Sequence, residues 1–121
     1  MTDEMHTETR LYTRVPLTAP VEIHQGGSVW SQNTIDISLQ GLTTDHPGDW
    51  DAQYNEPFTV IIKLDDGRKL ELTAYLQNVE DNHLGFSLGH LDIQSKETMR
   101  QLLAPHMESA RLDWELKNLG D

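Results

Sequence analysis

The stretch FTVIIKLDDGRKLELTAYL, residues 58–76, decides the fold class of this chain. Apolar residues occupy every second position on both sides of a DDG sequence at residues 65–67; they are Phe58, Val60, Ile62 and Leu64 before it, and Leu70, Leu72, Ala74 and Leu76 after it. A period of two puts alternate side chains on one face of a β-strand, and Asp-Gly is a common turn between antiparallel strands. The stretch therefore predicts an antiparallel hairpin with one buried face.

A second hairpin is predicted upstream. Val21 and Ile23 alternate with polar residues, and the sequence QGG at residues 25–27 offers the backbone freedom that a tight turn needs. Another alternating run follows over residues 28–39 and breaks at Gly41. We expect these two runs to pair as antiparallel strands.

After the second hairpin the pattern is less regular. Residues 43–57 are rich in turn formers and are expected to form a long loop that crosses an end of the structure or serves function. Turn residues at 80–82 precede a last short strand, with Leu84, Phe86 and Leu88 facing inward. Five or six closely spaced strands with almost no helix between them predict a mostly β fold, an antiparallel barrel or sandwich.

Near the C-terminus the apolar period becomes helical. Met99, Leu102 and Leu103 follow the i, i+3, i+4 spacing of one helix face, with Ser95 expected as the N-cap. Pro105 is expected to end this helix, because it lacks a backbone donor and restricts the residue before it.

A second helix is expected from about residue 106 to residue 119. Its predicted apolar stripe consists of Met107, Ala110 and Trp114, and Gly120 is expected to follow its C-terminus. The chain is thus divided into a flexible arm (residues 1–9), a barrel domain with the first helix (residues 10–104) and a helical extension (residues 105–121).

Composition excludes several classes of function. The 121 residues include 20 acidic side chains, 9 Lys or Arg and no cysteine, for a formal net charge of -11. Without cysteine there is no disulfide framework, thiol nucleophile or thiolate zinc site. Excess negative charge disfavours DNA, RNA and anionic membranes as partners. With no apolar run of about 18 residues and no signal-peptide pattern, a soluble cytoplasmic protein without membrane insertion is expected.

The few cations are unevenly distributed. Residues 1–62 hold nine acids but only two cations, Arg10 and Arg14. Pro16 shortens any helix here, so two arginines four residues apart have little architectural purpose. The planar guanidinium fork binds phosphate or a guanine edge bidentately, which indicates an anion clamp. The alternative is that each arginine pairs with a surface acid such as Glu8 or Asp36.

A second motif is DISLQG, residues 36–41, with the pattern D-x-S-x-x-G. Period-two geometry predicts that Asp36 and Ser38 share the outward face, roughly 7 Å apart. The opposite, buried face is predicted to carry Ile35, Ile37 and Leu39. Gly41 would let the chain turn sharply or let a ligand approach the backbone. The alternative is an ordinary strand end, where Asp, Ser and Gly are frequent.

Together these motifs resemble the PilZ domain, a bacterial receptor for cyclic di-GMP, whose ligand-binding residues form R-x-x-x-R followed about twenty residues later by D/N-x-S-x-x-G. All the motif positions match, and the resemblance covers about residues 10–104. It implies a six-stranded antiparallel β-barrel with a C-terminal helix, and a binding module rather than an enzyme. The ligand-binding residues that it implies are Arg10, Arg14, Asp36, Ser38 and Gly41.

The resemblance also implies a ligand chemistry that suits these side chains. An arginine fork can donate to guanine O6 and N7 or to a phosphate, and a carboxylate can accept from guanine N–H groups. Members that bind a stacked ligand pair often have a further arginine just before the motif, where this chain has Thr9. One ligand per chain is therefore expected, with the signal read by an unidentified downstream protein. The alternative is an adaptor that binds no nucleotide and acts through protein contacts in pilus or flagellar function.

The remaining chemistry-bearing residues predict no further site. The six histidines show no helical pair with zinc-ligand spacing, so no metal or other cofactor is expected. Ser38 stands in no G-x-S-x-G elbow, so catalysis is not expected either. The three tryptophans, Trp30, Trp50 and Trp114, are interpreted as packing residues, with partner contact by Trp50 as an alternative.

Overall fold

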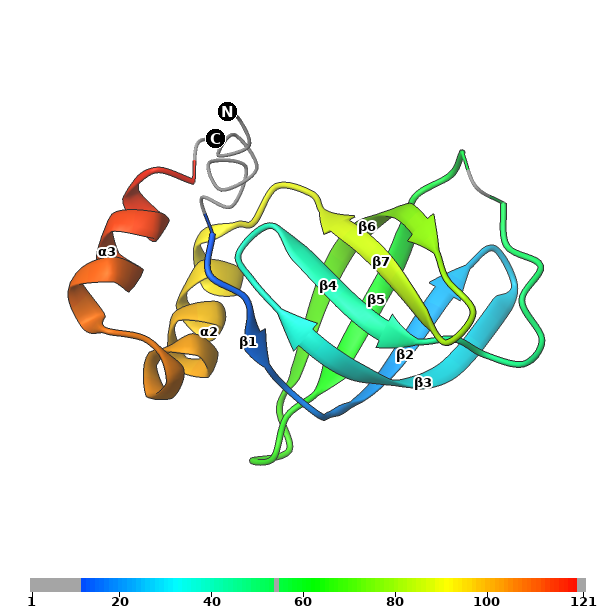
Figure 1. Cartoon of the computed structure of the whole chain (residues 1–121), viewed down its shortest axis with the longest axis horizontal. Coiled ribbons are helices and arrows are strands. Elements are labelled where there is room, and N and C mark those ends of the chain that lie inside the picture. Colours follow the sequence, from blue (N-terminus) through cyan, green and yellow to red (C-terminus); the bar gives the residue numbers. More distant parts are fainter. Residues whose placement is uncertain (1–11, 54, 120–121) are drawn as a thin grey trace.

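The computed structural model describes residues 12–53 and 55–119. The strands in this part of the chain are β1 (Val15–Pro16), β2 (Pro20–Gln25), β3 (Ser28–Ile37), β4 (Gly41–Asp45), β5 (Phe58–Lys63), β6 (Lys69–Val79) and β7 (His83–Leu88). The helices are α2 (Ile93–Leu103), a 3-10 turn η1 (Ala104–His106) and α3 (Ser109–Lys117). Figure 1 shows both α-helices at one end of the barrel and the loop between β4 and β5 at the other. Arg10 and the predicted arm lie outside the described residues.

The strands form one closed antiparallel sheet. Their order is β1-β3-β2-β5-β6-β7-β4, and an additional β3–β4 pairing closes the ring. Strand β1 lies outside this ring and extends the β2 side of β3, with Val15 opposite Ile37 and Pro16 opposite Asp36. The predicted six-stranded antiparallel barrel is therefore confirmed, and β1 is an addition that the alternation pattern did not show.

Both predicted hairpins are present. In the β5–β6 pair, Val60 lies opposite Leu72 and Ile62 opposite Leu70, and all four side chains are buried. The turn after β5 has Gly67 at φ 91°, and the turn between β2 and β3 has Gly26 at φ 60°. L-residues rarely adopt these left-handed conformations, which explains glycine at both positions.

Strand β3 departs from strict alternation near its end. A register shift between Thr34 and Asp36 against β4 marks a β-bulge. Because a bulge inserts one extra residue, Thr34 and Ile37 both point inward and Ile35 is 42% exposed. The prediction that Ile35 belongs to the buried face is wrong, whereas Ile37 and Leu39 are buried as expected.

The predicted loop over residues 43–57 is also too long. Its first three residues belong to β4, which pairs with β3 on one side and β7 on the other. The sequence GLTTD is mostly polar and shows little alternation, so tertiary pairing rather than intrinsic preference makes it a strand.

The loop after β4 carries an aromatic cluster at its end of the barrel. Trp50 lies 4.6 Å from Trp30 and 5.8 Å from Phe58 between ring centroids, and the latter pair is stacked. The Trp30 indole nitrogen donates to the carbonyl oxygen of Asp49 at 2.8 Å. The packing roles predicted for Trp30 and Trp50 are therefore confirmed.

Helix α2 packs its predicted apolar face on the barrel, with Met99 and Leu103 fully buried. Its N-cap is Asp92 rather than Ser95, because the Asp92 carboxylate accepts from the Ser95 backbone N–H at 2.7 Å. That hydrogen bond lowers the pKa of Asp92 from its ordinary 3.8. Pro105 lies in η1, where the α-helix has ended as predicted.

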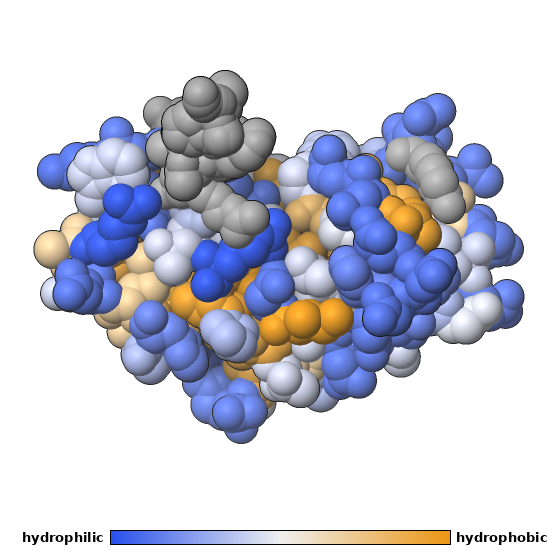
Figure 2. Space-filling view, viewed as in Figure 1, coloured by the Kyte–Doolittle hydropathy of each residue, from blue (hydrophilic) through white to orange (hydrophobic). Residues whose placement is uncertain are grey.

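Helix α3 is shorter than expected and buries a different face. It buries Leu112 and Glu115, whereas Ala110 is exposed and Trp114 is 42% exposed beneath the Arg111 guanidinium. The predicted stripe through Ala110 and Trp114 is therefore wrong. Figure 2 shows hydrophobic residues between the helices and the barrel on the face viewed there. Neither helix of the described residues is long and apolar enough to cross a membrane.

Candidate functional site

Arg14 and Asp36 meet at the rim of the barrel. Arg14 directly precedes β1, and the β1–β3 pairing puts Asp36 opposite Pro16, two residues further along. Arg14 Nη1 donates to Asp36 Oδ1 at 2.7 Å and to the Thr43 hydroxyl at 3.4 Å. The structure thus shows the ion pair that was the alternative to an anion clamp for Arg14.

This ion pair remains open to solvent. The Arg14 and Asp36 side chains are 37% and 30% exposed. Exposed pairs of this kind contribute about 0–1 kcal/mol to stability, because water solvates the separated charges well. A ligand that offers both an acceptor for the guanidinium and a donor for the carboxylate can therefore replace the pair at small cost.

Gly41 provides the space in which the guanidinium lies. A Cβ atom built on Gly41 would be 2.7 Å from Arg14 Nη2 and 3.3 Å from the backbone oxygen of Phe86. The first distance is shorter than real Cβ contacts allow. Close approach of the Arg14 side chain and the Phe86 carbonyl therefore accounts for glycine at this position, and approach of a ligand to the backbone stays a prediction.

Ser38 does not share the outward face with Asp36, so that prediction is wrong. Its side chain is buried, at 3% exposure, because β3 ends at Ile37 and the alternation ends with it. Ser38 Oγ accepts from the Gln40 backbone N–H at 3.2 Å, and the Ser38 N–H donates to the Gly41 carbonyl at 2.9 Å. Ser38 therefore holds the turn that positions Gly41.

The structure brings three of the predicted site residues together in different roles. Arg14 and Asp36 present exposed charged groups, and Gly41 lies against the guanidinium. Arg10, the other half of the predicted clamp, lies outside the described residues, so its place in the site stays a prediction.

Sequence reasoning missed the residues that hold the segment before Arg14. Thr13 donates from its backbone N–H to Glu115 Oε1 at 3.0 Å and from its hydroxyl to Oε2 at 2.6 Å. The Tyr12 hydroxyl donates to the carbonyl oxygen of Asn118 at 2.6 Å. The available signal was the position of Glu115, three residues after Leu112 and hence on the same helix face.

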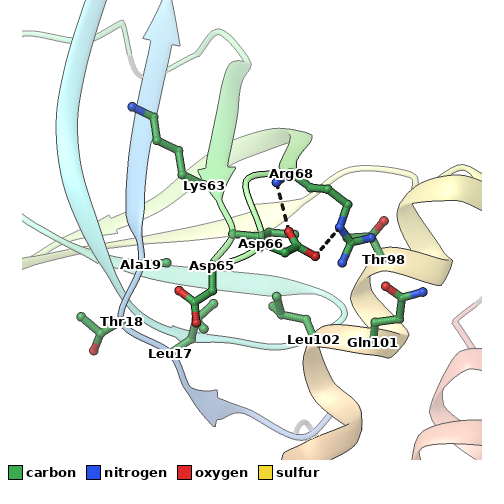
Figure 3. A pocket seen from close by; sticks show the side chains of 11 residues that line it. Leu17, Thr18, Ala19, Lys63, Asp65, Asp66, Arg68, Thr98, Gln101 and Leu102 are labelled. Carbon is green, nitrogen blue, oxygen red and sulfur yellow. Dashed lines mark hydrogen bonds and ion pairs between the residues drawn. The ribbon is translucent and has the colours of Figure 1, made fainter.

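A pocket of about 230 Å³ lies elsewhere, between the β5–β6 turn and α2. Figure 3 shows Arg68 and Asp66 reaching it from the turn, and Leu102 from the helix. Arg68 Nε donates to Asp66 Oδ2 at 2.8 Å, and the Arg68 backbone N–H lowers the pKa of Asp66 from its ordinary 3.8. Like Arg14, Arg68 already has a carboxylate on its guanidinium, and the lining of this pocket includes no residue of the two sequence motifs.

The described residues contain no group of three or more histidine and acidic side chains that could hold a metal ion. The rim offers charged groups of both signs to a ligand. It has a multidentate cationic donor beside an anionic acceptor, at the solvent-exposed edge of a closed barrel.

Comparison with known proteins places the whole barrel in one family. The family model for the PilZ domain matches residues 8–104. Among solved structures, the PilZ domain of YcgR from Escherichia coli with c-di-GMP superposes with a TM-score of 0.70 at 13% identity, covering 88% of this chain and 97% of that one. The PilZ domain of CeSA from a cellulose-synthesizing bacterium gives 0.62 at 24% identity, covering 78% and 99%.

The inhibitor of motility MotI/DgrA from Bacillus subtilis has a TM-score of 0.69 at 16% identity. The match covers 79% of this chain but 49% of that protein, so it spans about half of the Bacillus protein's length. At these identities the structural likeness shows the fold alone, and the family rests on the sequence match to residues 8–104.

Proposed function

This chain belongs to the PilZ domain family, and from that premise we propose that it is a receptor for cyclic di-GMP that signals to a partner protein. The single observation that carries the proposal is the exposed pairing of Arg14 with Asp36 beside Gly41. The proposed ligand-binding set is the family motif as it stands here, namely Arg10, Arg14, Asp36, Ser38 and Gly41. In this set the buried Ser38 acts through the turn that positions Gly41. The role is regulatory rather than catalytic.

The chemistry of the two charged groups supports this ligand. The Arg14 guanidinium can donate in parallel to guanine O6 and N7 or to a phosphate, and the Asp36 carboxylate can accept from guanine N1–H and N2–H. Cyclic di-GMP presents both kinds of group and about two negative charges. It can therefore satisfy Arg14 and Asp36 after their mutual ion pair opens.

Binding also supplies a signal in this proposal. Arg10 and Arg14 carry like charges on one segment, and a dianion between them removes their repulsion. Residues 12–15 are already bonded to α3 and β3, so the ordering expected for residues 8–15 is now proposed for residues 8–11. Placement of residues 8–11 over the barrel face by the ligand then creates the surface that a partner reads. Hydrogen exchange of residues 8–11 that is equal with and without ligand would reject this mechanism.

One ligand per chain is proposed, because Thr9 stands where a third arginine would offset the charge of a second ligand. Calorimetry measures this stoichiometry directly. A value of two ligands per protomer would contradict it.

The deciding experiment is a calorimetric titration of the purified chain with cyclic di-GMP. Arg14→Ala should weaken binding at least tenfold, since it removes charge-assisted contacts of about 1.5–3 kcal/mol each. Arg68→Ala is the matched control, because Arg68 also forms an exposed pair with an aspartate at 2.8 Å. No binding by the wild type, or equal loss in both variants, would overturn the proposal.

A second candidate function is an adaptor that binds no nucleotide and acts through protein contacts. The observation favouring it is that Asp36 already engages the Arg14 guanidinium at 2.7 Å. The same titration separates the two functions, because an adaptor of this kind gives no heat with cyclic di-GMP.

A further inference from the structure

Glu115 is a charged side chain in the core of the protein. It lies on α3 and is fully buried, with an exposed fraction of 0%. A carboxylate in this environment is stable only when its oxygens accept several hydrogen bonds or pair with a cation. The donors of those hydrogen bonds therefore identify the residues that Glu115 holds in place.

Most of the hydrogen bonds to Glu115 come from Thr13. The Thr13 backbone N–H lies 3.0 Å from Oε1 and 3.1 Å from Oε2, and the Thr13 hydroxyl lies 2.6 Å from Oε2. Arg111 Nε, one turn earlier on α3, donates to Oε2 at 2.7 Å. Helix α3 therefore holds the backbone at the residue directly before Arg14.

Arg14 is consequently fixed from both sides. Val15 and Pro16 pair with β3 after it, and Thr13 is bonded to α3 before it. Tyr12, buried at 8% exposure, adds a hydrogen bond to the carbonyl oxygen of Asn118. With both flanks held, the backbone from which the Arg14 side chain extends has little freedom to move away from Asp36.

We propose that Glu115 is a positioning residue for the nucleotide site, acting on Arg14 through Thr13. This inference rests on the proposed function. If the bond to Thr13 is lost and only about one chain in ten keeps the segment in place, the apparent Kd rises about tenfold. Because coupling between two sites is reciprocal, ligand at the rim also stabilises the docking of α3.

The test compares two carboxylate-to-amide substitutions on the same helix. Glu115→Gln weakens the acceptor for Thr13, whereas Asp113→Asn changes an exposed carboxylate whose bond goes to Arg100 of α2. Calorimetry with cyclic di-GMP should show about a tenfold weaker Kd for Glu115→Gln and less than a twofold change for Asp113→Asn. In the wild type, saturating ligand should slow hydrogen exchange of α3, and in Glu115→Gln this effect should be smaller.

Thr13→Val provides a second variant, should Glu115→Gln fail to fold. It removes one donor from Glu115 and keeps the backbone N–H, so a weakening of about threefold is expected. Binding equal to wild type in a folded Thr13→Val or Glu115→Gln protein overturns the inference, and α3 contact is then structural only.

The same experiment distinguishes failure of the inference from failure of the proposed function. If the wild type gives no heat with cyclic di-GMP, both the receptor function and the positioning role of Glu115 are overturned. If the wild type binds and Arg14→Ala does not, but Glu115→Gln binds like wild type, only the positioning role is overturned.

Discussion

Two arginine–carboxylate pairs of the same length lie in different surroundings in this protein. We call Arg14–Asp36 the exposed pair and Arg111–Glu115, after its carboxylate, the buried pair; both have an N–O distance of 2.7 Å. The Arg111 side chain itself is 45% exposed, so the two pairs differ in the burial of the carboxylate. Asp36 is 30% exposed, whereas Glu115 is 0% exposed. Water can solvate Asp36 when its partner leaves, but it cannot reach Glu115, so only the exposed pair can exchange partners cheaply.

The difference in burial assigns the two pairs different roles: the exposed pair can bind a ligand, and the buried pair holds the structure around it. The exposed pair lies at the rim with Gly41 beside it, where a ligand can reach both charges. The buried pair belongs to α3, and its carboxylate also accepts from Thr13, so no ligand is needed to satisfy it. Four changes test this contrast, in order of the expected free-energy effect.

The largest effect is expected at the buried pair. Glu115→Ala should lower the free energy of unfolding by about 2–3 kcal/mol, because the partly buried donors of Thr13 lose their acceptor. Urea unfolding followed by tryptophan fluorescence measures this change. The matched control is Asp113→Ala, whose side chain is exposed and should change stability by less than about 0.5 kcal/mol. Equal effects of the two substitutions would break the contrast.

An intermediate effect is expected for Gly41→Ala. The new methyl group would meet Arg14 Nη2 and the Phe86 carbonyl, so the guanidinium must shift from its place beside Asp36. Stability should fall by about 1 kcal/mol, and affinity for cyclic di-GMP by about tenfold, which is 1.4 kcal/mol. Unfolding and calorimetry are measured together.

Gly48→Ala serves as the control for this substitution, because a Cβ at Gly48 has no neighbour within 4 Å and the backbone there is not left-handed. It should leave both quantities unchanged. A Gly41→Ala protein that binds like wild type would show that the position of the guanidinium does not matter.

A smaller effect on stability is expected at the exposed pair. Arg14→Ala should change the free energy of unfolding by less than about 0.5 kcal/mol, even though it weakens ligand binding at least tenfold. Urea unfolding of the ligand-free protein measures the first quantity. A loss above about 2 kcal/mol would assign Arg14 to the scaffold rather than to recognition.

The smallest expected effect is the salt dependence of the coupling within each pair of residues. In a double-mutant cycle, the coupling between Arg14 and Asp36 should be about 0.2 kcal/mol and should fade as ionic strength rises from about 0.1 M to about 1 M. The coupling between Thr13 and Glu115 should hold over the same range, because burial prevents screening. Parallel loss of both couplings would contradict the difference in burial.

The sequence was sufficient for the regular parts of the fold. Strict alternation in residues 58–76 predicted the central hairpin, and glycine-containing turns marked where strands reverse. These features are local, since a period of two and a left-handed turn residue are visible in a short window. The i, i+3, i+4 spacing that ends at Leu103 identified α2 for the same reason.

The misplaced residues depend on contacts that a short window does not contain. Ile35 is exposed because β4 imposes a bulge on β3, and Ser38 is buried because the strand ends one residue earlier. The Arg14–Asp36 ion pair was one of the alternatives predicted from the sequence, because the two side chains carry opposite charges. The contact between Glu115 and Thr13 was not predicted, because the two residues are 102 positions apart along the chain.

That sequence separation also orders the events of biosynthesis. Ribosomes deliver a chain from its N-terminus, and 22 positions separate Arg14 from Asp36, so both members of the exposed pair emerge early. Thr13 must wait until α3 has been translated before it meets its acceptor. A nascent polypeptide therefore contains Arg14 and Asp36 before it contains Glu115, which holds the segment before Arg14. A product truncated ahead of Glu115 would keep the two recognition residues but lack the contact that positions them.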